Sequence, residues 1–152
     1  MVTVSAEIEI RAPIELCFDM ARNIEIHTQT VWKHTQERVV AGRTSGLIGE
    51  GETVTFQAKH FLIRQKLTSR VTDYIRPYKF VDEMKSGAFK NMRHEHEFID
   101  LGNRTLMKDT LYFEAPFGII GWIVERVILK EYMKRFLTFR NKQLKEIAER
   151  AI

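Results

Sequence analysis

The 152-residue sequence contains a single cysteine, Cys17, and only three prolines. One cysteine cannot form a disulfide within the chain and does not suggest a thiolate metal cage, so we expect Cys17 to be a small buried apolar side chain on a helix. No glycine-rich phosphate loop, zinc-ligand spacing or nucleotide-binding fingerprint occurs. These absences argue against disulfide-stabilised, zinc-binding and nucleotide-binding classes of protein.

Long apolar runs are also missing, since no stretch approaches the run of about 18 apolar residues that a membrane span needs. The N-terminal residues alternate between apolar and polar instead of placing a basic segment before an apolar run, so we expect no secretory signal and a cytoplasmic location. Apolar residues make up 44% of the chain and charged residues 29%, which is typical of globular proteins. We expect one domain over residues 1–152.

Positive charge is in modest excess, with a formal net charge of +4 at pH 7. Between positions 130 and 150 there are seven Lys or Arg residues against three Glu. The simplest interpretation is the solvated outer face of a helix, and the alternative is a docking surface for nucleic acid or anionic lipid. We do not expect nucleic acid to be the partner.

Residues 119–152 contain no proline and predict one long C-terminal helix. At about 100° per residue, its apolar side chains form a stripe that needs a partner of comparable length. The apolar residues at 120–128 fall on the opposite side, so either the helix breaks near Lys130 or other protein covers that end. Arg140 lies almost at the centre of the stripe, and because it cannot lose its charge it must reach solvent or find a partner inside.

Upstream of this helix, the sequence predicts a strand over residues 3–10 that has one buried face. Pro13 then suits the first position of a short helix, and residues 24–36 indicate a second short helix or a loop. Apolar and polar residues alternate in several runs across residues 52–114, which predicts strands joined by short turns. This order indicates an α+β architecture: a curved antiparallel sheet of six to seven strands wrapped around the long helix.

The inner face of the predicted sheet is not purely apolar. A polar group left unpaired in a dry core costs about 1 to 3 kcal/mol. These side chains therefore need one another, water or a ligand. Strand alternation places the following polar residues on that face: His60, Gln65, Ser69, Asp73, His94, His96 and Asp109.

The pairing of the last two strands can be predicted more closely. A four-residue loop at 101–104 places His96 opposite Asp109 and His94 opposite Leu111. Three interpretations remain open for this cluster: a satisfied buried network, polar anchors in a ligand cavity, or a metal site of two His and one Asp. General acid–base catalysis needs the same geometry, but no nucleophile lies beside the pair, so we predict no catalytic residue.

Three segments carry a family resemblance: EIRAPIELCFDMARNIEIH, FVDEMKSGAFKNMRHEHEF, and TLMKDTLYFEAPFG before the terminal helix. They resemble the SRPBCC or START-like superfamily, whose helix-grip fold is shared by the birch pollen allergen and bacterial polyketide cyclases. The resemblance implies a cavity between sheet and helix that admits a hydrophobic small molecule. No Rieske or iron ligand set and no cyclase-specific constellation is recognisable. The matching positions are Pro13, His94, His96, Phe98, Pro116, Phe117 and Gly118.

We therefore predict a protein that binds a hydrophobic or aromatic small molecule, such as a lipid, quinone or polyketide, without a cofactor or metal. The alternatives are a polyketide cyclase- or dehydrase-type enzyme that uses the same cavity, and a ribosome- or RNA-associating protein that acts through the basic C-terminal helix. The predicted ligand-binding residues are Phe56, Gln65, Leu67, Ser69, Met92, His94, His96, Phe98, Met107, Asp109, Leu111, Phe117, Met133, Phe136 and Arg140.

The entrance to the cavity is predicted between two glycine-bearing segments, residues 42–51 and 117–122. The second segment is apolar on more sides than one sheet can cover, so part of it should be exposed, and exposed apolar patches usually mark interaction sites. A homodimer formed through this patch is the competing explanation.

Overall fold

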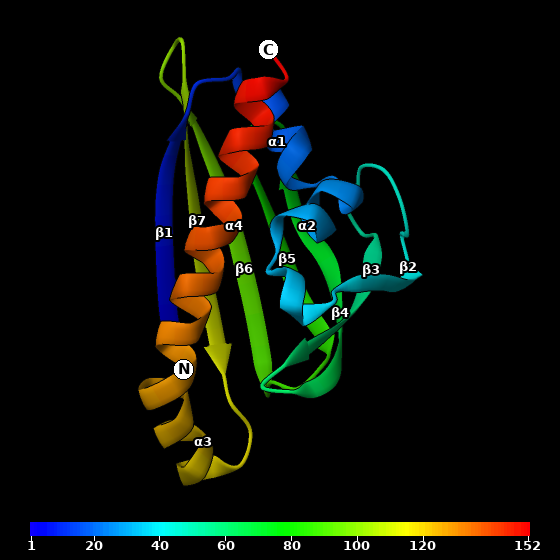
Figure 1. The fold of residues 1–152 in the computed structure, drawn as a ribbon, viewed down its shortest axis with the longest axis vertical. Helices are drawn as coiled ribbons and strands as arrows, with labels where there is room; N and C mark the ends of the chain where they lie inside the picture. Colours follow the sequence, from blue (N-terminus) through cyan, green and yellow to red (C-terminus); the bar gives the residue numbers. More distant parts are fainter.

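The computed structural model describes residues 1–152, and its core is one curved sheet of seven antiparallel strands in the order β1-β7-β6-β5-β4-β3-β2. The long C-terminal helix lies across one face of this sheet (Figure 1). The predicted helix-grip architecture is thus confirmed. The strands are β1 (Val2–Ile10), β2 (Arg38–Gly42), β3 (Thr53–His60), β4 (Ile63–Ile75), β5 (Lys79–Ser86), β6 (Asn91–Asp100) and β7 (Thr105–Glu114).

Two short helices, α1 (Ile14–Ala21) and α2 (Ile24–Thr30), follow the first strand, as predicted. The side chain of Asn23 accepts a hydrogen bond from the backbone N–H of Ile26 and so caps the start of α2, which satisfies one of the free N–H groups at a helix start. A 3₁₀ turn (Lys33–Thr35) then leads to β2. Residues 24–36 are therefore partly helical and partly loop.

The register of β6 and β7 is the predicted one. His96 lies opposite Asp109 and His94 opposite Leu111. Between β4 and β5 the register shifts between Val71 and Asp73. Beyond that bulge, Tyr74 packs against the buried Phe18, so Tyr74 occupies the inner face. The prediction that Asp73 lies there was wrong, because a bulge inserts one residue and reverses the alternation.

The C-terminal helix is not uniform. It consists of α3 (Gly118–Val124), a π-helical turn (Glu125–Leu129) and α4 (Lys130–Arg150). In the π turn, the carboxylate of Glu125 is buried and accepts a hydrogen bond of 2.8 Å from the backbone N–H of Ala115. This bond ties the start of the helix to the end of β7. The irregularity expected near Lys130 is thus a π turn that ends just before it.

Apolar packing joins α4 to the sheet at two places. Near the C-terminal end of α4, Leu144 and Ala148 belong to a cluster with Phe18 of α1 and with Cys17, which is buried as expected. Further toward its N-terminal end, Leu137 packs against β1 and β7. None of the helices combines the length and the apolar character needed to cross a bilayer.

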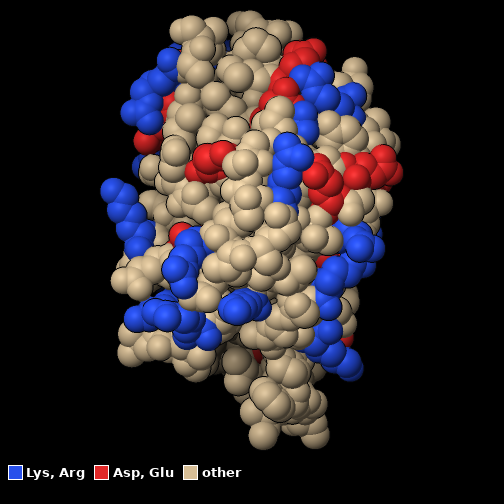
Figure 2. Space-filling view, turned by 90° about the vertical axis from the view of Figure 1, so that its right-hand side faces the viewer, with Lys and Arg blue, Asp and Glu red and all other residues tan.

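The two ends of the surface differ in character. At the bottom of Figure 2, the α3 end of the molecule protrudes as a knob of uncharged residues. Lys and Arg side chains cover much of the adjoining lower half of the same face, whereas most of the visible Asp and Glu lie above them (Figure 2).

Candidate functional site

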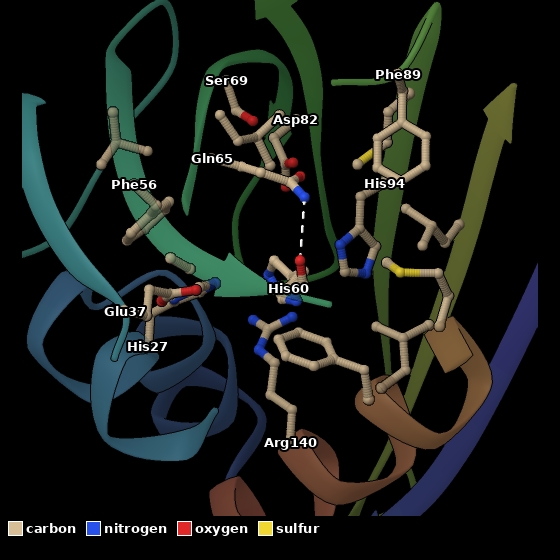
Figure 3. Close-up of a pocket in the computed structure, with 18 of the residues that line it drawn as sticks. His27, Glu37, Phe56, His60, Gln65, Ser69, Asp82, Phe89, His94 and Arg140 are labelled. Carbon is tan, nitrogen blue, oxygen red and sulfur yellow. Dashed lines mark hydrogen bonds and ion pairs between the residues drawn. The ribbon is translucent and has the colours of Figure 1, made fainter. Parts of the chain in front are cut away.

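A cavity of about 330 Å³ lies between α4 and the inner face of the sheet. Of the 32 residues that line it, 19 are hydrophobic. Its size and mostly apolar wall match those of small-molecule sites, which measure about 300 to 1,000 Å³ and carry a few polar groups. The sheet supplies one wall through β3 to β7, while α2 and α4 supply others (Figure 3).

Most of the predicted ligand-binding residues line this cavity. They come from strands whose alternation turns them inward and from the stripe of α4 that faces the sheet. These residues are Phe56, Gln65, Leu67, Ser69, Met92, His94, His96, Leu111, Met133, Phe136 and Arg140.

Four predicted residues do not line the cavity. Phe98 and Met107 belong to the closed core around α1 and α4, because alternation decides the face of a residue but not its position along the strand. Asp109 is buried behind the two histidines, as the contacts below show. Phe117 is 82% exposed on the side of the helix start that faces solvent.

A cluster of four ionisable side chains occupies the sheet wall. The ring of His96 lies between two carboxylates, with Nε2 at 2.8 Å from Asp82 Oδ2 and Nδ1 at 3.0 Å from Asp109 Oδ1. His94 Nε2 donates to the same Asp109 oxygen at 2.9 Å. The two imidazoles stack at 3.8 Å, and Phe80 stacks on the other side of His96 at 4.1 Å.

These contacts separate the protonation behaviour of the two histidines. Burial alone would lower the pKa of His96, but the carboxylates of Asp109 and Asp82 outweigh it and raise that pKa above its ordinary value. Burial and the neighbouring His96 lower the pKa of His94. Burial would raise the pKa of Asp109, yet the hydrogen bonds from both histidines hold it well below its ordinary value. The cluster therefore favours a charged His96 and a neutral His94.

Asp82 was missed by the sequence analysis, which assigned its strand without assigning faces. The signal was present: Phe80 and Asp82 alternate on β5, and they pair with His96 and His94 respectively. Burial would raise the pKa of Asp82, but the hydrogen bond from His96 lowers it below its ordinary value.

Asp82, His94 and His96 each offer a ligand atom within 4.8 Å of the others, so the carboxylate of this possible metal set is Asp82 and not the Asp109 considered from the sequence. Both ring nitrogens of His96 are already engaged by carboxylates. A metal ion would have to displace the contact with Asp82. The arrangement therefore corresponds most closely to a hydrogen-bonded network in a cavity wall, in which only Oδ2 of Asp109 is buried without a hydrogen-bond partner.

Two further pairs of polar side chains lie on the cavity wall. His60 Nδ1 lies 2.6 Å from the hydroxyl of Tyr132 on α4, and burial lowers the pKa of this histidine. At the α2 side, His27 Nδ1 lies 2.8 Å from Glu37 Oε1. His60 was predicted on the inner face, whereas Tyr132 and the His27–Glu37 pair were not anticipated.

Arg140 differs from these groups. It was expected to reach solvent or to find a partner inside, and it has no partner in the protein but faces the cavity. The residue is only 6% exposed, and its side chain extends from α4 toward the middle of the pocket, where no marked interaction reaches it (Figure 3).

The cavity does not open at the predicted place. Of residues 42–51 only the buried Ile48 lines it, and none of residues 117–122 does. The exposed lining residues are Phe61, Lys66 and Ala88. The opening thus lies by the β3–β4 turn and the β5–β6 loop. The predicted position was wrong because α3 stands away from the sheet instead of closing over its end.

Comparison with known proteins supports the architecture. No family model and no curated protein matches the sequence. Among solved structures, the protein TTHA0849 from Thermus thermophilus is 20% identical, with a TM-score of 0.80 and 99% of each chain covered.

Two further structures have names that bear on the fold. A START superfamily protein from Mycobacterium smegmatis is 16% identical, with a TM-score of 0.75 and 99% of each chain covered. Ara h 8.0201 is 12% identical, with a TM-score of 0.61 over 94% of this chain and 97% of its own. The chain therefore has the helix-grip fold of the START-like superfamily that its sequence resembles.

Proposed function

We propose that the protein binds a hydrophobic or aromatic small molecule, such as a lipid, quinone or polyketide, in the cavity between the sheet and α4. The observation that carries the proposal is the composition of this cavity. Its wall is mostly apolar. Its ionisable side chains lie at separate positions: on the sheet wall, at the α2 side and, as Arg140, on α4. Apolar walls supply affinity, while a few fixed polar groups orient a ligand.

Native mass spectrometry of protein purified under mild conditions tests the proposal, followed by thermal unfolding in the presence of lipids, quinones and flavonoids. We expect a bound small molecule and a raised melting temperature with at least one class. The test variant is Ala58→Phe, whose side chain fills the cavity that Ala58 lines and should block binding. The matched control is Ala41→Phe, at an exposed position, which should still bind. If no compound shifts unfolding, or if both variants bind equally well, the proposal is wrong.

A cyclase- or dehydrase-type enzyme is the second candidate, favoured by the contact of His94 and His96 with the cavity. A neutral His94 can accept a proton and a charged His96 can donate one, which are the roles that general acid–base catalysis requires. This candidate requires turnover of a bound polyketide-like substrate that His96→Ala or Asp109→Asn abolishes. Binding without turnover would leave the carrier function alone.

A further inference from the structure

Arg140 is the one buried charged side chain without a partner in the protein. The buried acids Asp109 and Glu125 accept hydrogen bonds, and both buried histidines contact a carboxylate. The guanidinium of Arg140 has no ion pair and no hydrogen bond, and it lines the cavity. A guanidinium stays protonated and carries five N–H donors. In the unliganded protein these donors have no protein acceptor and can meet only water in the cavity.

The nearby acids cannot serve as its acceptor in this arrangement. Asp82 is attracted electrostatically by Arg140, but its hydrogen bond is formed with His96. Glu37, which also lines the cavity, forms its ion pair with His27. The donors of Arg140 thus remain available to a group inside the cavity.

We propose that the ligand carries a carboxylate, that this carboxylate pairs with the guanidinium of Arg140, and that the apolar part of the ligand lies against neighbouring residues such as Met133, Phe136 and Leu111. The inference rests on the proposed function and narrows it to amphipathic organic acids. The planar fork of arginine matches a carboxylate with two parallel N–H···O bonds, and such charge-assisted bonds are about twice as strong as neutral ones.

Matched pairs of acid and amide test this inference, because the two members of a pair have the same shape and differ in charge. Titration calorimetry at pH 7.5 with decanoate against decanamide, and with 2-naphthoate against 2-naphthamide, covers a flexible and a rigid apolar body. We expect the acid to bind at least about tenfold more tightly than its amide. Arg140→Met should abolish this preference while leaving amide binding intact.

The outcomes separate the two proposals. If acid and amide of one pair bind equally well, the cavity binds apolar molecules and the role of Arg140 is overturned. If neither pair binds, both proposals are overturned for ligands of these shapes. A preference that vanishes between low and high salt, or that persists in Arg140→Met, would reflect attraction to the surface charge, which salt screens. That result would also overturn the inference.

A second, independent observation concerns the protruding end of the molecule. More than half of the surface of each of five large apolar side chains is exposed along α3 and the π turn: Phe117, Ile119, Ile120, Trp122 and Val127. Exposed apolar patches of this kind mark interaction sites. The patch lies outside the cavity, because none of its residues lines that space.

Charge distinguishes the two occupants that such a patch could have. Within residues 117–130 the exposed charged side chains are Arg126 and Lys130. Arg126 pairs with the buried Glu125 at 2.7 Å and lies over the ring of Trp122, while Lys130 has no ion pair. In a symmetric dimer the patch meets its own copy, which would bring these cations together. An anionic bilayer would attract them and accept the apolar side chains at its interface.

We infer that the helix start, residues 117–128, docks on anionic lipid bilayers. Flotation with phosphatidylglycerol-containing vesicles, and with vesicles of phosphatidylcholine alone, tests this. We expect binding to the anionic vesicles that falls with salt, and its loss in Ile120→Asp. The control is Leu62→Asp, an exposed apolar residue on the β3–β4 turn, which should still bind. Absence of vesicle binding, or a dimer that Ile120→Asp dissociates, would overturn the inference.

Discussion

Replacing Arg140 with methionine should stabilise the unliganded protein. Methionine keeps an unbranched side chain on the same helix but removes a charge that forms no ion pair or hydrogen bond in the protein. Exchanging buried ionic groups for apolar residues of similar volume is often neutral or stabilising by about 1 to 4 kcal/mol. Because Arg140 faces a cavity and not a closed core, we expect the lower part of this range, about 1 to 2 kcal/mol. The melting temperature should then rise by about 2 to 8 °C for a chain of this length.

Urea unfolding of the ligand-free protein measures this change. The matched control is Arg135→Met on the same helix, where the arginine is exposed and pairs with Glu131, and the change should stay within about 0.5 kcal/mol. Adding decanoate in excess should reverse the order, because a ligand that binds only the folded form adds stability that grows with the logarithm of its concentration divided by its Kd. A loss of more than about 1 kcal/mol in Arg140→Met would mean that Arg140 supports the fold, and it would refute the reasoning.

Three further predictions concern the network and the helix start. Asp109→Asn should cost about 1 to 3 kcal/mol at pH 7 in urea unfolding, since it removes one of the two carboxylates that pair with the buried His96. Because the folded pKa of Asp109 lies below its ordinary value of 3.8, this cost should disappear only as the pH falls below that value. The folded pKa of His96 lies above its ordinary value of 6.5, so the stability lost in His96→Gln should be largest below pH 6.5 and shrink as the pH rises through the folded pKa. Gly121→Ala should destabilise strongly in urea unfolding, because its Cβ would lie 1.8 Å from the carbonyl oxygen of Pro116; an unchanged midpoint would contradict this packing.

Much of the fold could be predicted because strand alternation and register depend on local sequence. The four-residue loop at 101–104 was enough to bring His96 opposite Asp109. Which of these residues contacts a ligand depends on how far along the strand the core ends, and alternation carries no such information. Phe98 and Asp109 therefore share a face with His94 without lining the cavity.

The remaining site residues depend on contacts between distant segments. Asp82 joins the histidines through the pairing of β5 with β6, and Tyr132 meets His60 only because α4 crosses the sheet. A bulge reverses the face of Asp73, and no residue in β4 indicates from the sequence that the strand contains a bulge. The sequence did indicate that Arg140 is unusual, since a guanidinium at the centre of an apolar stripe conflicts with the pattern around it.

The start of the C-terminal helix presents a related conflict, in which apolar side chains lie where the fold does not need them. A continuous helix with apolar residues on opposite sides can bury only one side against a single sheet. Leu137 and Leu144 occupy the buried side, while the contact of Glu125 with Ala115 holds the exposed end in place. Packing therefore gives no reason for Ile120 to be apolar, and Ile120→Asp should change the free energy of unfolding by no more than about 0.5 kcal/mol. If this variant keeps its stability and loses vesicle binding, the patch serves an interaction; if it loses stability, the patch is part of the fold and the bilayer inference fails.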